Sequence, residues 1–175
     1  MAERRSFQGI TKAARALLSA GEGKDVDYKE KVKGLHAEDL VAFANSENGG
    51  AILIGVGEVT GRDGKQKGEP IGHPIDDASR LQIMDKALSC SPPILVDLYA
   101  ENLGLRPFYR LEIPSGTQKP YATSAGTYKI REDGRNNSLL PEQLLNMFLD
   151  REGAEFRVRF SEATGALESR MAEAL

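Results

Sequence analysis

Acidic residues stand at three points around residues 21–58, the stretch whose residue types best suit chemistry. Glu22 precedes a predicted strand, Asp27 lies within it, and Glu58 follows a second, buried strand. Hard cations such as Mg²⁺ or Mn²⁺ prefer carboxylate oxygens, usually one or two together with water and a substrate phosphate. Because the chain holds 26 acidic residues, chance trios are common, and spacing alone favours plain surface acidity over a site.

Two basic residues are placed where they could contact a phosphate. Lys29 follows Asp27 by two residues and therefore shares its face of the strand. As a point charge it could approach a phosphate held there, or it could simply pair with Asp27. Arg131, on a later predicted strand, is a second candidate phosphate contact.

Basic and aromatic residues elsewhere could form a nucleic-acid-binding face, with scattered surface arginine as the alternative. Together with Lys29, the candidates are Lys119, Tyr128, Lys129, Arg131, Arg135, Arg157 and Arg159. Tyr128 could stack on a base, although packing at the core or its rim is the commoner role. The net charge of −3 weakens the case for strong nonspecific binding, which depends on neutralising phosphates.

The segments around the acidic residues read as strand, helix, turn and strand. Residues 26–29 alternate apolar with charged side chains, as in a half-buried strand. Apolar residues recur at helical spacing across 35–44, and a Gly-Gly turn follows at 49–50. Residues 51–56 are an unbroken apolar run rich in β-branched residues, which predicts a central strand covered on both faces.

Helices and strands continue along the rest of the chain. The patterns predict three further helices, over 7–20, from Asp76 or Asp77 to about 89, and from Pro141 onward. They predict strands over 94–100, 105–113, 126–131 and 156–160. Residues 59–69 are predicted to form a hairpin or loop. In the helix that begins at Asp76 or Asp77 and in the helix that begins at Pro141, the side chains predicted to be buried are Leu81, Ile83, Met84, Leu88, Leu144, Leu145, Phe148 and Leu149.

This order of elements favours an α+β (mixed α/β) fold, in which helices pack on a mixed β-sheet. We expect one domain, with its main part at residues 1–150 and an extension at 151–175. The extension is predicted to be a strand with two arginines on one face, followed by a weakly amphipathic helix.

Composition excludes several classes of protein. No apolar run approaches the 18 or so residues of a membrane span, and the N-terminus does not resemble a signal peptide. A single cysteine, Cys90, excludes an internal disulfide, so a cytoplasmic protein is expected. The Gly-rich stretch at 55–65 lacks the spacing of a Walker loop or a dinucleotide-binding turn, so nucleotide binding ranks last among the functions considered.

Five short motifs, in the same order along the chain, resemble those of the Schlafen AlbA-like domain family (AlbA_2), once labelled a divergent AAA domain. The resemblance spans roughly residues 21–148. The motifs are Asp27-Tyr28-Lys29 (Glu-Phe-Lys in the family), residues 42–46 with Gly49-Gly50 (Ala-Phe-Ala-Asn-Thr-x-Gly-Gly, here with one extra residue), Ile54-Gly55-Val56, Lys119-Pro120-Tyr121, and Tyr128-x-x-Arg131.

The resemblance implies a site of three carboxylates with a divalent metal, as in eukaryotic members that cut transfer and ribosomal RNA. The matched positions are Glu22, five residues before the first motif, Asp27 within that motif, and Glu58, the second residue after Ile-Gly-Val. Two of the three exchange Asp and Glu relative to the family. The exchange keeps the charge but moves the ligand by about one methylene, and such sites are sensitive to small displacements.

We therefore expect a divalent-metal-dependent endoribonuclease acting on structured RNA such as tRNA. Glu22, Asp27 and Glu58 would hold Mg²⁺ or Mn²⁺, and Lys29 would assist. The alternative is a non-catalytic, regulatory DNA- or RNA-binding module in which the acidic cluster is structural. The expected partner is RNA or DNA rather than a membrane, and two copies could pair as a homodimer to form a longer basic groove.

Overall fold

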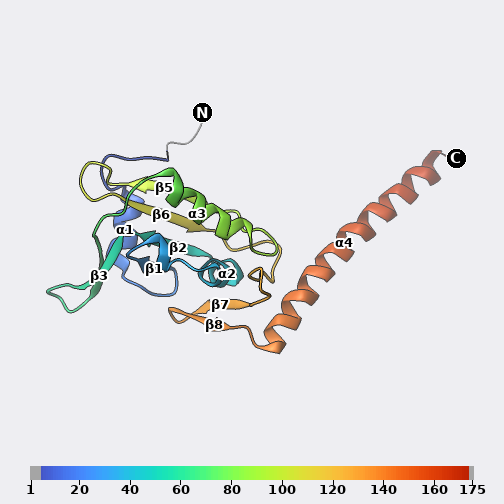
Figure 1. Ribbon diagram of the computed structural model, residues 1–175. Helices are drawn as coiled ribbons and strands as arrows, with labels where there is room; N and C mark the ends of the chain where they lie inside the picture. The colour runs from blue at the N-terminus through green and yellow to red at the C-terminus, as the bar shows by residue number, and fades with distance from the viewer. Residues whose placement is uncertain (1–4, 174–175) are drawn as a thin grey trace.

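The computed structural model describes residues 5–173, which form a mixed sheet, two hairpins and four α-helices (Figure 1). The helices are α1 (Lys12–Ala20), α2 (Ala37–Asn45), α3 (Asp77–Leu88) and α4 (Pro141–Glu173), with a single 3₁₀ turn, η1 (Val32–Gly34). The strands are β1 (Val26–Lys29), β2 (Gly50–Ile54), β3 (Val56–Thr60), β4 (Gln66–Pro70), β5 (Asp97–Glu101), β6 (Phe108–Ile113), β7 (Lys129–Glu132) and β8 (Arg135–Ser138).

The main sheet has four strands in the order β1-β2-β6-β5. β1 runs parallel to β2, with Asp27 opposite Ile52, and the other neighbours are antiparallel. The sheet is therefore mixed and the predicted α+β class is confirmed. The predicted central strand is confirmed as β2, and the hairpin partners predicted in the middle of the chain are confirmed as β5 and β6.

Alternate residues of β2 serve two apolar clusters on opposite faces of the sheet. Ile52 and Ile54 pack in a cluster with Phe43 of α2 and Ile83 of α3, on the face where Figure 1 shows α2 and α3. Leu53 packs in a second cluster with residues of α1 and β1. This two-sided burial explains why the sequence of β2 is continuously apolar rather than alternating.

The first helix is shorter than predicted, because its N-terminal part is extended. Phe7 donates its N–H to Ala100 O at 2.9 Å, so residues before α1 line the edge of β5. α1 begins only at Lys12, where Thr11 Oγ1 accepts from Ala14 N and caps the helix. The buried Glu101 carboxylate accepts from both Thr11 N and Thr11 Oγ1, and its charge is favourable at a helix N-terminus.

The helix predicted after Asp76 is confirmed, but its burial pattern was partly wrong. Asp76 Oδ1 accepts from Ser79 N and caps α3. Ile83 is buried, whereas Leu81 and Leu88 are exposed. Only one narrow side of α3 contacts the core, so apolar spacing overestimated the buried face.

The strand predicted over 156–160 was wrong. These residues belong to α4, which leaves the sheet as one long helix in Figure 1. An alternating pattern needs a neighbouring strand to become β-structure, and the described residues offer none there. Glu155 and Arg159 instead form an i,i+4 ion pair that supports a helix. Leu145 and Leu149 are also exposed rather than buried, and the predicted boundary at residue 150 falls inside α4.

Two hairpins complete the described fold. β3 and β4 pair antiparallel, which confirms the hairpin reading of residues 59–69. β7 and β8 pair antiparallel beside α2. The strand predicted over 126–131 is confirmed only in part, because β7 spans Lys129–Glu132. No helix within residues 5–173 combines the length and the apolarity needed to cross a bilayer.

Candidate cation site at the edge of the sheet

The three predicted carboxylates gather around β1, an edge strand of the main sheet. Asp27 lies within β1 and is only 6% exposed. Glu22 precedes β1 and is more open, and its Oε1 accepts a hydrogen bond from Tyr28 N at 3.1 Å. Glu58 is an exposed residue of β3.

The β3–β4 hairpin is what brings Glu58 toward the other two. Glu58 stands opposite Gly68, so both point to the same face of the hairpin. That face lies against β1: a Cβ placed on Gly68 would be 2.8 Å from Tyr28 Cζ. The absence of a side chain at position 68 therefore allows the close approach that sets Glu58 beside β1.

Glu22 is close enough to Asp27 and Glu58 for their charges to affect its protonation. Burial is the main cause that raises the pKa of Glu22 above its usual 4.5, and the negative charges of Asp27 and Glu58 raise it further. The N–H of Tyr28 and the charge of Lys29 act in the opposite direction. Carboxylates that disfavour one another's charge favour a proton or a cation between them.

Asp27 Oδ2 is the one buried side-chain oxygen or nitrogen, among residues 5–173, without a hydrogen-bond partner. The ammonium of Lys29 lies 2.9 Å from it and forms an ion pair with it, and this interaction helps to raise the pKa of Lys29. A carboxylate oxygen has two lone pairs, so Oδ2 keeps acceptor capacity beyond its ion pair with Lys29, and a bound cation is one group that could use it.

The donor set fits a hard cation, although it does not form a closed cage. Within the described residues, no three His, Cys, Asp or Glu side chains are arranged to hold a metal by themselves. Mg²⁺ commonly takes one or two carboxylates and fills its remaining positions with water and substrate phosphate. Asp27 and Glu22, whose charges act on each other's surroundings at the start of β1, are a donor set for an ion of that kind.

Lys29 is held in the cluster by acidic neighbours on two sides. Besides Asp27, its ammonium lies 3.7 Å from Asp39 Oδ1 of α2. Burial alone would lower the pKa of Lys29, but its interactions with Asp27, Asp39 and Glu22 outweigh burial and raise it. Lys29 therefore stays protonated at neutral pH, as a phosphate contact requires.

Arg131, predicted as a phosphate contact, is buried and occupied by protein groups. Its Nη2 donates to Gly23 O at 2.9 Å and to Val26 O at 3.2 Å, and its Nη1 donates to Asn136 Oδ1 at 3.0 Å. Nη2 also lies 3.7 Å from Asp27 Oδ1. The guanidinium thus ties β7 to the start of β1 and lies beside one oxygen of Asp27, while Lys29 lies beside the other.

Two residues that sequence reasoning missed complete this network. Asn136 Nδ2 donates to Asp39 Oδ1 at 2.7 Å, which joins the β7–β8 hairpin to α2. Asp39 Oδ2 accepts from His36 N at the start of α2. An acidic residue three positions into a helix is a recognisable capping signal. Nothing in the local pattern indicates the partner 97 residues away.

The other predicted nucleic-acid contacts of the hairpin differ in accessibility. Arg135 is exposed in β8, next to Gly134, whose Cβ position would lie 3.3 Å from Gly23 Cα. Arg135 therefore stands at the rim of the cluster. Lys129 is half-buried, with its ammonium 3.1 Å from Ser138 Oγ, and Tyr128 is half-buried as well.

Lys119, Arg157 and Arg159 do not join the cluster. Lys119 Nζ donates to Ser46 O at 2.6 Å, at the C-terminal end of α2, and burial lowers its pKa. A cation there stabilises the helix end. Arg157 and Arg159 lie on α4, which leads away from β1 in Figure 1.

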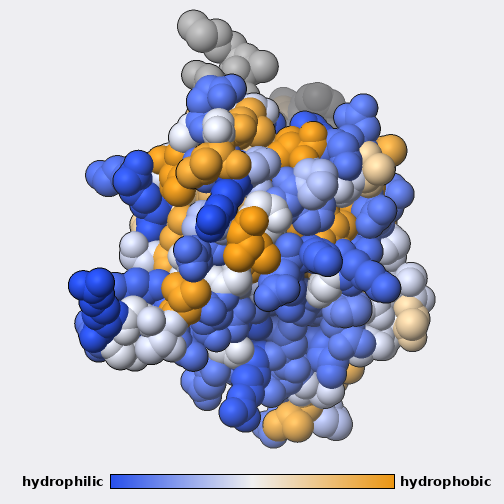
Figure 2. All heavy atoms as spheres, turned by 60° about the vertical axis from the view of Figure 1, so that its left-hand side comes forward, coloured by the Kyte–Doolittle hydropathy of each residue, from blue (hydrophilic) through white to orange (hydrophobic). Residues whose placement is uncertain are grey.

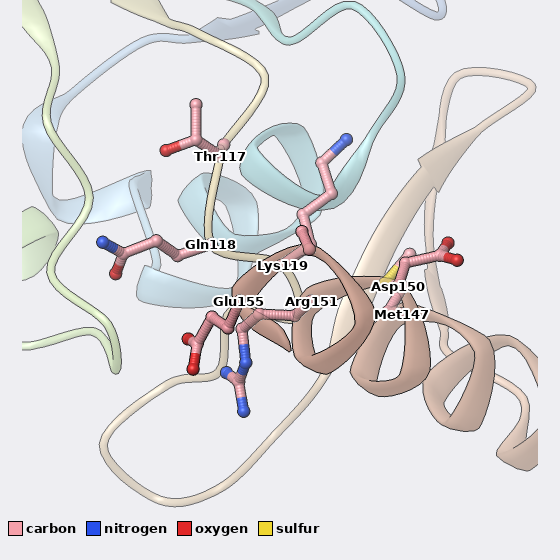
Figure 3. Close-up of a pocket in the computed structure, with 9 residues that line it drawn as sticks. Thr117, Gln118, Lys119, Met147, Asp150, Arg151 and Glu155 are labelled. Carbon is pink, nitrogen blue, oxygen red and sulfur yellow. The ribbon is translucent and has the colours of Figure 1, made fainter. Parts of the chain in front are cut away.

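A cavity of about 560 Å³ lies apart from the acidic cluster, between residues 116–119 and the start of α4. Figure 3 shows Lys119 directed away from Arg151 and Glu155, which point outward from α4. The chemistry-bearing residues of β1 and β3 do not line it. The face that carries β3 is mostly hydrophilic with scattered apolar side chains (Figure 2), as an exposed polar site requires.

Comparisons with known proteins agree with this architecture. The model of the family described as Schlafen, AlbA_2 matches residues 22–140, a span that includes all three carboxylates. No curated protein matches the chain.

Two solved structures are similar. The N-terminal domain of a putative ATP-dependent DNA helicase RecG-related protein from Nitrosomonas europaea is 20% identical, with a TM-score of 0.53 over 74% of this chain and 95% of that one. The DIP2311 protein from Corynebacterium diphtheriae is 17% identical, with a TM-score of 0.44 over 74% of this chain and 23% of that one. The first likeness supports the fold. The family match covers most of the chain, and the protein belongs to the Schlafen, AlbA_2 family.

Proposed function

We propose that this domain is a divalent-metal-dependent endoribonuclease that acts on structured RNA such as tRNA. The observation that carries the proposal is the group of carboxylates at the β1 edge, where Asp27 Oδ2 accepts no hydrogen bond and the charges of Asp27 and Glu58 both act on Glu22. Membership of the Schlafen, AlbA_2 family adds support, because the match includes these three positions.

Each residue of the site has a distinct task in this proposal. Asp27, fixed by Arg131 on one oxygen, offers the other oxygen to Mg²⁺ or Mn²⁺, and Glu22 and Glu58 complete the acidic side. When bound, such an ion supplies charge neutralisation at the phosphate and a more acidic water. Lys29 and Arg135 contribute positive charge, from within the cluster and from its rim, and orient the RNA backbone.

The test is cleavage of purified tRNA by the full chain with and without Mn²⁺, compared with the Glu58→Gln variant. Glu58 is exposed, so its substitution removes a charge without opening the core. We expect metal-dependent cleavage by the unmodified protein. In the variant the rate should fall by about 100-fold, the scale on which a group acting at the reacting atoms contributes.

Glu69→Gln is the matched control. Glu69 lies on the same hairpin, opposite Gly57 and hence on the other face from Glu58. The Glu69→Gln variant should cleave tRNA at the same rate as the unmodified protein. Equal cleavage by the two variants, or cleavage that survives removal of divalent metal with a chelator, would contradict the proposal.

The second candidate is a non-catalytic DNA- or RNA-binding module. It is favoured by the ion pairs of Lys29 and Arg131, which give Asp27 a structural role without any metal. That function predicts salt-sensitive retention of RNA or DNA without cleavage. Retention would persist in Glu58→Gln, because removing a negative charge does not weaken phosphate binding.

A further inference from the structure

α4 exposes a row of large apolar side chains along most of its length. The row, called the apolar stripe below, consists of Leu145, Leu149, Phe156, Phe160, Leu167 and Met171, each between 56% and 67% exposed. Successive members are 4, 7, 4, 7 and 4 residues apart, so the pattern repeats every 11 residues. At about 100° per residue, all six fall within an arc of about 80° around the helix. Exposed apolar residues are ordinary singly, whereas a continuous row indicates a surface that is covered by something.

The stripe faces away from the rest of the domain. Met147, Arg151 and Ala154 line the cavity beside residues 116–119, and at about 100° per residue they lie on the side of α4 roughly opposite the stripe. Neither apolar core cluster includes a residue of α4. The described part of the chain therefore leaves the stripe uncovered.

We propose that the stripe of one copy pairs with the stripe of a second copy in an antiparallel helix pair, so that the chain forms a homodimer. The spacing reads the same in both directions about Val158. Reversing one helix therefore sets every large apolar residue against another, and the pairs are Leu145 with Met171, Leu149 with Leu167, and Phe156 with Phe160. Self-complementarity of this kind is what a two-fold interface requires.

The period suits two helices that stay together over their whole length. Eleven residues in three turns are 3.67 residues per turn, close to the 3.6 of a straight helix, so the stripe drifts little. At the centre, Phe156 and Phe160 already stack within one helix, with ring centroids 6.0 Å apart. Two copies would bring four aromatic rings together in the middle of the pair.

The area is sufficient for a dimer. Each stripe residue exposes on the order of 100 Å², so covering both stripes removes about 1,200 Å² from water, the size at which interfaces become specific and stable. α4 has 33 residues and is therefore about 50 Å long. It projects from the body in Figure 1, so the two bodies would sit at opposite ends without collision.

Sedimentation velocity on the full chain, over about 1 to 100 μM protein, tests the proposal. The unmodified protein should sediment as a dimer that dissociates on dilution. Phe160→Glu should raise the dimer dissociation constant by about 100-fold or more, because each dimer then buries two unpaired charges. A protein that stays monomeric at the highest concentration would overturn the proposal, whatever else it binds.

Val158→Glu is the matched control. Val158 is 58% exposed against 60% for Phe160, but it lies on the far side of the helix from the stripe. The dimer dissociation constant of Val158→Glu should stay within about threefold of that of the unmodified protein, since surface changes outside an interface have small effects. Equal weakening by both variants, with helix content by circular dichroism unchanged, would refute a stripe-specific interface.

Disulfide trapping tests the orientation. Leu145→Cys and Met171→Cys proteins are mixed and oxidised, and the native Cys90 is only 3% exposed and stays out of the reaction. The antiparallel pair predicts a crosslink between the two variants and none within either variant alone. A crosslink formed by Leu145→Cys alone would show a parallel pair and reject this arrangement.

Discussion

At the scale of single residues, Asp27 serves two partners at once. Arg131 approaches its Oδ1 from the hairpin side, and Lys29 stands beside its Oδ2. A buried carboxylate is costly unless it is paired, and these two cations supply that pairing. Oδ2 accepts no hydrogen bond, so the carboxylate keeps acceptor capacity beside the Lys29 ion pair.

Replacing Glu58 should lower the pKa of Glu22. Burial keeps that pKa above 4.5, but the contribution from Glu58 disappears in Glu58→Gln. Carbon-13 NMR titration of the Glu22 carboxyl measures the change, with Glu69→Gln as the unaffected control. If Glu22 titrates identically in Glu58→Gln and in the unmodified protein, Glu58 does not interact with Glu22 and does not belong to the acidic cluster.

The same shift has a definite sign for stability. Folding raises the pKa of Glu22, so the folded state binds the proton more tightly than the unfolded chain does. The contribution of Glu22 to stability is therefore greatest below pH 4.5 and is lost as pH rises through the raised, folded value. In Glu58→Gln the pKa of Glu22 in the folded protein is lower, so this contribution to stability is lost at a lower pH than in the unmodified protein.

At the scale of elements, the sequence predicted best where one strand or helix is defined by its own pattern. β2 was recognisable because both of its faces are buried, and α3 because Asp76 caps it. The alternation at 156–160 misled because strand formation depends on a partner that local sequence does not contain. The roles of Arg131 and Asn136 were equally invisible, since their partners lie about 100 residues away.

The bonds of Arg131 predict how the β7–β8 hairpin is attached. Arg131→Lys should lower the free energy of unfolding by about 2 to 4 kcal/mol, because an ammonium cannot reproduce the guanidinium's several directed bonds and weakens the pairing of Asp27. Urea denaturation followed by circular dichroism, at one fixed protein concentration, measures it. Arg135→Lys, an exposed change in the same hairpin, should stay within about 0.5 kcal/mol of the unmodified protein. Equal stabilities for the two variants would mean that the buried network does not anchor the hairpin.

At the scale of the whole molecule, the acidic site and the apolar stripe occupy separate regions. The site lies at one edge of the sheet, and the stripe runs along the helix that leaves the other side of the body (Figure 1). Motif order predicted the family, which the family match confirms, and it selected the three carboxylates as candidates. It did not predict how they approach one another, because that depends on the β3–β4 hairpin crossing β1 at Gly68.

The proposed nuclease function requires the acidic cluster to bind a divalent cation, and crystals soaked in MnCl₂ test this most directly. Anomalous difference density should appear in contact with the Asp27 carboxylate and with Glu22 or Glu58, and it should be absent from crystals of Glu58→Gln soaked in the same way. Well-ordered crystals with no anomalous peak at Asp27, or with manganese bound only elsewhere on the protein, would contradict the account.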